Sequence, residues 1–209
     1  WASTIYHGLP KSLLPFNPVG GEYLAFLGRI SPEKRPDRAI EIATKLGKPL
    51  KMAAKIDAAD KRYWEETIRP LVEGNPLVEF IGEIGDHQKS AFLGGADALL
   101  FPIDWPEPFG IVMIEAMACG TPVIAWPRGA APEVVEQGVT GFMTAVGDVD
   151  AMADAALNIL RSKDVYQRMG QAARANAIER FHPRLIVPKY LEAYHRTIQN
   201  TSKCGNTRP

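Results

Sequence analysis

The stretch that decides the fold reads Glu107-Pro-Phe-Gly-Ile-Val-Met-Ile-Glu115 and continues as Ala-Met-Ala-Cys-Gly-Thr-Pro-Val-Ile-Ala125. Its pattern predicts a tight loop, an apolar helix over Phe109–Cys119, a Gly-Thr-Pro turn and a buried strand. Glu107 and Glu115 are its only charges. Because Glu115 falls in the middle of an apolar helix, its carboxylate is costly to bury unless another group pairs with it.

The start of this helix is a candidate anion site. The amides of Phe109, Gly110 and Ile111 are expected there, where the first N–H groups lack partners and the helix dipole is positive. Such an end suits a phosphate, and the two flanking carboxylates suit hydroxyls. A ligand that combines phosphate with sugar hydroxyls fits this arrangement.

The residues alone leave ordinary structural roles open. Glu115 would then pair with a cation such as Arg128, and Glu107 would be a solvated loop residue. Arg29 and Lys34 are expected on the loop after the first strand. Two cations beside a helix start can form a diphosphate site, but they can equally belong to a solvated basic loop.

Composition narrows the class of protein. The 209 residues are 46% hydrophobic and 23% charged, which is typical of a soluble globular chain. Lys plus Arg and Asp plus Glu both number 24, so no net charge favours nucleic acid or a membrane surface. No apolar run approaches the roughly 18–20 residues of a membrane span. Cys119 and Cys204 are too few for a disulfide framework, and a reducing, cytoplasmic location is expected.

Short apolar runs alternate with helical patterns along the chain, which predicts a parallel sheet of about six strands with helices on both faces. The strands are expected at Glu22–Gly28, Pro49–Ala54, Leu77–Ile81, Asp97–Phe101, Thr121–Trp126 and Gly141–Ala145. Ligands of such sheets bind at the carboxyl ends of the strands. This rule selects the loops Gly28–Lys34, Gly82–Gly85, Pro102–Phe109 and Pro127–Glu133.

The run from Glu107 to Ala125 resembles the E-x7-E segment of retaining GT-B glycosyltransferases, especially family 4, also called glycosyltransferase group 1. The resemblance extends from about Tyr23 to the final helix. It implies an α/β, Rossmann-like fold that forms the C-terminal, donor-binding half of a GT-B enzyme, with additional C-terminal helices. The implied activity is transfer of a sugar from a nucleoside-diphosphate sugar to an acceptor, with retention of anomeric configuration.

The resemblance also assigns roles to residues. Gly28-Arg29-x4-Lys34 is similar to the family segment whose Arg and Lys contact the donor diphosphate, and Glu107 resembles the residue that holds the transferred sugar. These three are the expected catalytic residues. Expected donor-binding residues are Glu107, the amides of Phe109, Gly110 and Ile111, Glu115 at the ribose, and the base-reading loop Gly82, Glu83 and Ile84.

No cofactor or essential metal is expected, since the sequence has no ligand-spaced cluster of His, Asp and Cys. The expected donor is a nucleoside-diphosphate sugar with an undetermined base (UDP, GDP or ADP). Absence of Gly-x-Gly-x-x-Gly and of a phosphate-binding loop argues against a nicotinamide enzyme and an NTPase. Expected partners are the donor and an N-terminal acceptor-binding domain, without nucleic acid or a transmembrane segment. Association of the full-length enzyme with a membrane surface stays open.

The resemblance divides the chain into four parts. Residues 1–21 would link a missing N-terminal domain to the nucleotide-sugar-binding domain, residues 22–182. Residues 183–200 would form a helix that returns to the missing domain, and 201–209 a disordered tail. Alone, such a chain is expected to bind donor without turnover.

Two departures from the family pattern stand out. Ala53-Ala54-Lys55 replaces a Gly-containing segment after the second strand, and Arg35 follows Lys34 where Gly is common. Two alternatives remain: a non-catalytic module that binds a nucleotide-sugar or a partner, and another GT-B enzyme such as a nucleotide-sugar epimerase.

Overall fold

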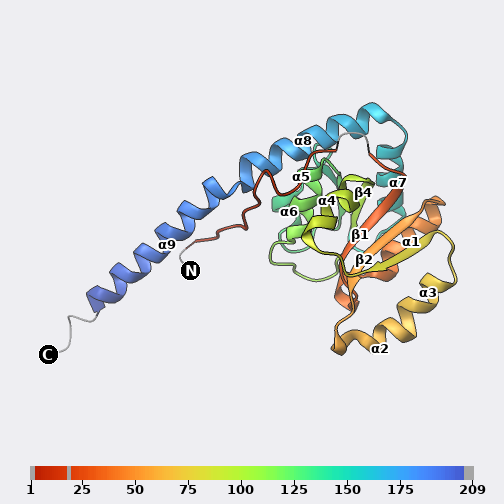
Figure 1. Cartoon of the computed structure of the whole chain (residues 1–209), viewed down its shortest axis with the longest axis horizontal. Coiled ribbons are helices and arrows are strands. Elements are labelled where there is room, and N and C mark those ends of the chain that lie inside the picture. The colour runs from red at the N-terminus through yellow and green to blue at the C-terminus, as the bar shows by residue number, and fades with distance from the viewer. Residues whose placement is uncertain (1–2, 18–19, 205–209) are drawn as a thin grey trace.

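A six-stranded parallel sheet forms the centre of the molecule (Figure 1). The computed structural model describes residues 3–17 and 20–204. The strands are β1 (Tyr23–Arg29), β2 (Leu50–Lys55), β3 (Val78–Gly82), β4 (Ala96–Phe101), β5 (Val123–Ala125) and β6 (Gly141–Met143). Their order is β3-β2-β1-β4-β5-β6, and each neighbouring pair is parallel. The α/β sheet expected from the sequence is confirmed.

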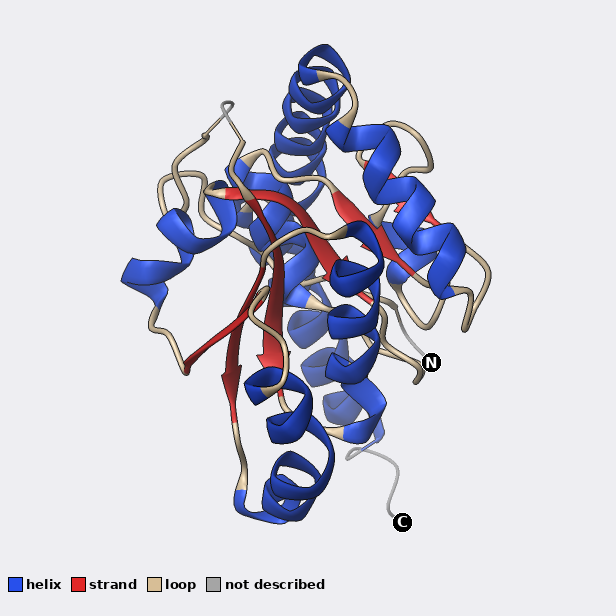
Figure 2. Ribbon diagram, turned by 90° about the vertical axis from the view of Figure 1, so that its right-hand side faces the viewer, coloured by secondary structure: helices blue, strands red, loops and turns tan. Residues whose placement is uncertain are grey.

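Helices cover both faces of the sheet (Figure 2). One face packs against α4 (Asp86–Gly94), α5 (Ile111–Cys119), α6 (Ala131–Val134) and the second half of α8 (Lys163–Phe181). The other packs against α1 (Pro36–Leu46) and α7 (Val149–Leu160). Leu24 and Phe26 of β1 point to the second face and Ala25 to the first, as the two-residue period of a strand requires. Apolar side chains on both faces explain why the strands read as continuous apolar runs.

The helical segment between β2 and β3 is interrupted rather than uniform. It consists of a 3-10 turn at Ala58–Asp60, α2 (Lys61–Tyr63), a wide π turn over Trp64–Ile68, and α3 (Arg69–Glu73). Pro70 has no N–H to donate and its ring would crowd the carbonyl four residues earlier. The π turn ends with the Arg69 N–H bonded to the Trp64 carbonyl, five residues back, which lets the chain stay helical into the proline.

The C-terminal helix α9 (Pro183–Cys204) projects away from the sheet, and the N-terminal segment runs beside its first half (Figure 1). The Leu9 amide donates to the Phe181 carbonyl at 2.8 Å, and the Tyr190 hydroxyl donates to the Ile5 carbonyl. The helix extends four residues beyond its expected end. Residues 1–2 and 18–19 of the expected linker, and 205–209 of the expected tail, lie outside the described residues.

Candidate active site

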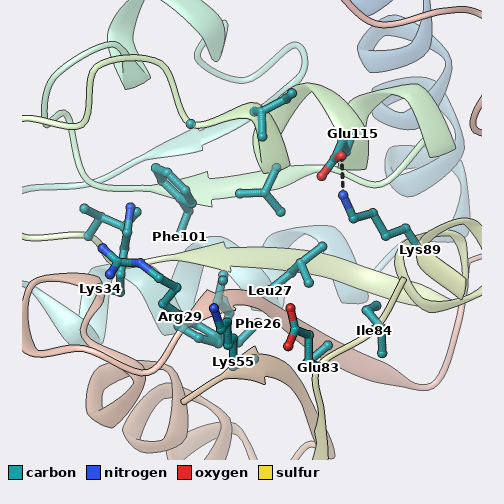
Figure 3. Close-up of a pocket in the computed structure, with 18 of the residues that line it drawn as sticks. Phe26, Leu27, Arg29, Lys34, Lys55, Glu83, Ile84, Lys89, Phe101 and Glu115 are labelled. Carbon is teal, nitrogen blue, oxygen red and sulfur yellow. Dashed lines mark hydrogen bonds and ion pairs between the residues drawn. The ribbon is translucent and has the colours of Figure 1, made fainter. Parts of the chain in front are cut away.

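A cleft of about 390 Å³ lies at the carboxyl ends of the central strands, where the sheet rule places a ligand site (Figure 3). Its apolar lining includes Phe26, Leu27, Phe101 and Ile103, and its polar lining consists of Arg29, Lys34, Lys55, Glu83, Lys89, Glu107 and Glu115. Three of the four loops selected from the sequence contribute to it. A mainly apolar cleft with a few convergent charged groups is typical of a small-molecule site.

The structure brings eight of the ten predicted site residues together in this cleft: Arg29, Lys34, Glu83, Ile84, Glu107, Gly110, Ile111 and Glu115. Phe109 and Gly82 do not line it. The Phe109 ring is buried, with ring centroids 5.7 Å from Tyr6 and 5.6 Å from Phe181. Gly82 ends β3 with a φ of 77°, a left-handed conformation that turns the chain toward Glu83.

The start of α5 differs from the sequence prediction by two residues. Gly110 precedes the helix with a φ of 73°, and a Cβ there would lie 2.8 Å from side-chain atoms of Met113 and Phe101. Burial of the Phe109 ring and the Gly110 turn thus start the helix at Ile111 rather than Phe109. Since the Met113 amide donates to the Gly110 carbonyl, the first-turn amides left to face a ligand are those of Ile111 and Val112.

Glu115 forms a buried ion pair on the wall of the cleft. Its residue is 4% exposed, and its Oε1 accepts a hydrogen bond from Lys89 Nζ at 2.8 Å, the dashed line in Figure 3. Burial raises the pKa of the Glu115 carboxyl, and the Lys89 ammonium offsets part of that rise. Burial lowers the pKa of Lys89, but its hydrogen bonds to Glu115 and Asp86 outweigh this effect, so the net shift is upward. Lys89 therefore remains an ammonium at neutral pH.

Lys55 and Lys89 are polar residues of the cleft that are not among the ten predicted site residues, and Lys89 was missed altogether. The partner considered for Glu115 was Arg128, but Arg128 instead donates to Asp104 at 2.8 Å. A usable signal was present. Lys89 falls one turn into a helix that follows the Gly82–Gly85 loop, and a buried carboxylate nearby requires a cation.

Glu107 is also paired, not solvated. Its Oε2 accepts from Lys34 Nζ and, at 2.6 Å, from Trp105 Nε1. Its carbonyl accepts from the Ala130 amide at 2.9 Å. A Cβ added to Gly129 would lie 2.1 Å from that carbonyl oxygen, so only glycine permits this contact. The fourth predicted loop thus supports Glu107 from behind instead of lining the cleft.

Arg29, Lys34 and Lys55 lie toward one end of the cleft in Figure 3, and the Glu115–Lys89 pair toward the other. Lys55 is bonded to Asp57 at 2.8 Å, and Arg29 lies 3.3 Å from Glu33 and 3.4 Å from Asp57. The hydrogen bond from Lys55 lowers the pKa of Asp57. Arg29 is exposed and its partners are half-buried, so these contacts can be exchanged at little cost, because surface ion pairs contribute only about 0–1 kcal/mol. This end of the cleft is suited to a polyanion.

Neither a membrane span nor a metal cluster emerges from the described part of the chain. Within residues 3–17 and 20–204, no helix is long and apolar enough to cross a membrane. In the same ranges, no group of three or more His, Cys, Asp and Glu side chains is placed to hold a metal ion.

Several known proteins are similar to this chain. HepE from Anabaena, solved with UDP, superimposes with a TM-score of 0.83 at 24% identity, over 93% of this chain and 57% of HepE. N-acetyl-alpha-D-glucosaminyl L-malate synthase of Bacillus anthracis is 33% identical over 134 residues, which are 64% of this chain and 35% of that protein. Phosphatidyl-myo-inositol mannosyltransferase of Mycobacterium leprae is 36% identical over 142 residues, 66% of this chain and 37% of that protein.

The chain spans well under two thirds of the length of these relatives. Its sheet and helices match the C-terminal part of the GT-B fold. The family profile described as "Glycosyl transferases group 1" matches residues 15–176, and so covers most of the chain and the whole cleft. The chain belongs to the group 1 glycosyltransferases, which are family 4 with the GT-B fold.

Proposed function

We propose that this chain is the donor-binding half of a retaining glycosyltransferase, with a nucleoside-diphosphate sugar as its ligand. The observation that carries the proposal is Glu115, a carboxylate buried in the cleft wall near the two first-turn amides of α5. The cleft suits a ligand that has a polyanion at one end and hydroxyls within hydrogen-bond distance of the Glu107 and Glu115 carboxylates. The relative named as a mannosyltransferase, and HepE solved with UDP and glucose, support the same class of ligand.

Each group has a place in this proposal. The amides of Ile111 and Val112 and the cations Arg29 and Lys34 stabilise the diphosphate and the negative charge that develops as it departs. Fixed cations and a helix start lower the barrier most when they contact the charge that forms in the transition state.

The remaining groups contact the ribose, the transferred sugar and the base. Glu115 accepts hydrogen bonds from the ribose hydroxyls, and Glu107 accepts from the transferred sugar. The base lies against Glu83 and Ile84, whose loop follows β3. A carboxylate that accepts from a ligand hydroxyl is a charge-assisted hydrogen bond, which contributes about 1.5–3 kcal/mol.

Turnover in this proposal requires a second domain that carries the acceptor site. The side chains Val187, Leu191, Tyr194 and Ile198 of α9 are more than half exposed, which is unusual for apolar groups on one helix. The second domain packs on this face and closes the cleft from water. Hydrogen exchange should be slower in α9 of a longer, two-domain protein than in the 209-residue chain. Equal exchange rates in the two would rule out this docking.

Calorimetric titration tests the binding proposal. The ligands are UDP, GDP and ADP with their glucose or mannose esters, and the proteins are wild type, Glu115→Gln and Glu179→Gln. Glu179 is an exposed residue of α8 and serves as the matched control. One nucleotide should bind with a Kd between micromolar and millimolar.

Its affinity should fall about 10- to 100-fold in Glu115→Gln, the equivalent of the charge-assisted bonds lost. It should stay unchanged in Glu179→Gln. Failure of all nucleotides to bind, or equal affinity in Glu115→Gln and wild type, would contradict the proposal.

A further inference from the structure

Trp105 is a large aromatic side chain next to the cleft that none of the roles above uses. It lies on the loop between β4 and α5 and is 39% exposed, whereas Trp126 is buried. Exposing an indole to water carries a free-energy cost, since burial of its large surface would be favourable. The position of this ring beside Glu107 offers a functional reason for its exposure.

The orientation of the indole is set by the site itself. Trp105 Nε1 donates to Glu107 Oε2 at 2.6 Å, the same oxygen that accepts from Lys34 Nζ. The Lys34 ammonium lies 6.0 Å from the centroid of the indole ring. The indole cannot rotate about the side-chain bonds that join it to the backbone without breaking the hydrogen bond to Glu107. Trp105, Glu107 and Lys34 therefore act as one unit at this side of the cleft.

The backbone that carries this unit is held in place. Pro106 and Pro108 flank Glu107, and each proline restricts the backbone of the residue before it, which is Trp105 for Pro106 and Glu107 for Pro108. Before them, the Asp104 amide donates to the Glu33 carbonyl at 3.0 Å, and the Asp104 carboxylate accepts from Arg128. An aromatic ring on a fixed loop loses little conformational entropy when a ligand packs on it.

We propose that Trp105 and Glu107 together form a carbohydrate subsite. The ring of the transferred sugar stacks on the exposed indole, and one of its hydroxyls donates to Glu107. A sugar ring presents C–H groups on its face and hydroxyls on its rim, so it fits a flat apolar surface beside a carboxylate. Among the described residues, the donors to Glu107 all reach Oε2, which leaves Oε1 for that hydroxyl. This inference rests on the proposed function, because it places the sugar of the same donor.

The subsite has a measurable signature that differs from that of the nucleotide site. Trp105 should increase the affinity that the sugar adds to the nucleoside diphosphate, without changing the affinity for the diphosphate alone. The ratio of the Kd of the diphosphate to the Kd of its sugar ester isolates this contribution. A merely structural role of Trp105 would change both constants together.

The experiment measures this ratio for the pairs UDP and UDP-glucose, GDP and GDP-mannose, and ADP and ADP-glucose, with the 209-residue chain. The variants are Trp105→Phe, which keeps an aromatic face but removes the N–H, and Trp105→Ala, which removes both. Thermal unfolding confirms that each variant is folded. The fluorescence change on binding, compared between wild type and Trp105→Phe, reports whether a sugar reaches the indole.

For the pair that wild type binds, the ratio should fall about tenfold in Trp105→Ala and about threefold in Trp105→Phe, while the Kd of the diphosphate changes less than twofold. Sugar-dependent quenching should disappear in Trp105→Phe. An unchanged ratio in Trp105→Ala, or an equal loss for diphosphate and sugar ester, would overturn the subsite but leave the donor proposal standing. If wild type binds no diphosphate at all, the proposed function itself fails, and the subsite with it.

Discussion

Replacing Lys89 by Met should destabilise the protein in a pH-dependent way. The substitution keeps most of the side-chain volume but leaves Glu115 as a buried carboxylate with no cation beside it. Glu115 Oε1 lies 2.8 Å from Lys89 Nζ, and the Glu115 side chain is only 5% exposed. At an effective dielectric constant of about 20, this separation gives roughly 6 kcal/mol of attraction. Because the Lys89 side chain is 22% exposed and partly solvated, we expect a loss of about 3 kcal/mol, at the low end for broken buried pairs.

The pH dependence follows from the sign of the shift. Without Lys89, burial and the negative charge of Asp86 both act on Glu115 and raise its folded-state pKa further. A folded pKa above the unfolded value means that the folded state binds the proton more tightly. The loss in stability should therefore be small below the unfolded pKa of about 4.3 and grow as the pH rises. It should become constant above the folded pKa of Glu115.

Urea unfolding of wild type and Lys89→Met at pH 4, 5.5, 7 and 8.5 measures this. Lys61→Met is the matched control, since Lys61 is exposed on α2. Adding Glu115→Gln to Lys89→Met should restore part of the stability at pH 7, because a neutral amide is cheaper to bury than an unpaired carboxylate. A loss that is the same at every pH, or a double variant no more stable than Lys89→Met, would refute the reasoning.

Two further predictions concern the backbone around the cleft. Arg35 has a φ of 52° and pairs with Asp37 through two hydrogen bonds of 3.0 and 2.8 Å. In thermal unfolding, Arg35→Gly should change Tm little, because relief of about 1 kcal/mol of left-handed backbone strain offsets the lost ion pair. Arg35→Ala loses the ion pair but keeps the strain, so it should lower Tm by several degrees. If both variants unfold at the same temperature, the strain is not significant. Gly129→Ala should lower both Tm and the affinity for nucleotide-sugar, because the new Cβ meets the Glu107 carbonyl. Gly138→Ala is the control: Gly138 has a φ of 74° and open space around it, so alanine there should lower Tm alone. Equal effects of the two alanine substitutions on affinity would show that the position of Glu107 does not affect donor binding.

The sheet could be predicted because its signal is local. A parallel strand covered on both faces reads as an apolar run, and its neighbours along the chain are helices with one apolar stripe. β1 and β2 lie within one residue of their predicted bounds. The rule that ligands meet the carboxyl ends of strands then selected four loops, three of which line the cleft. Arg29, Lys34 and Glu107 lie on those loops, whereas Glu115 was identified as a carboxylate inside an apolar helix, and the roles of all four rest on resemblance.

The contacts that position those residues could not be predicted, because they join segments that are distant in the chain. Lys89 is on α4 and Glu115 on α5, and the sequence indicates that Glu115 needs a cation but not which of the basic residues supplies it. The helix start at Ile111 depends on the packing of Phe109 against Tyr6 and Phe181, which come from opposite ends of the chain. Likewise, Arg35 has a left-handed backbone conformation that glycine adopts at lower cost, and the residue type at this position does not indicate it.

The central claim is that the cleft binds a nucleoside-diphosphate sugar with its ribose at Glu115. A crystal structure of the chain with the nucleoside diphosphate that binds in calorimetry tests this most directly. The account predicts ribose hydroxyls within hydrogen-bond distance of the Glu115 carboxylate and phosphate oxygens at the amides of Ile111 and Val112. A nucleotide bound elsewhere, or one bound in the cleft with its ribose directed away from Glu115, would contradict it.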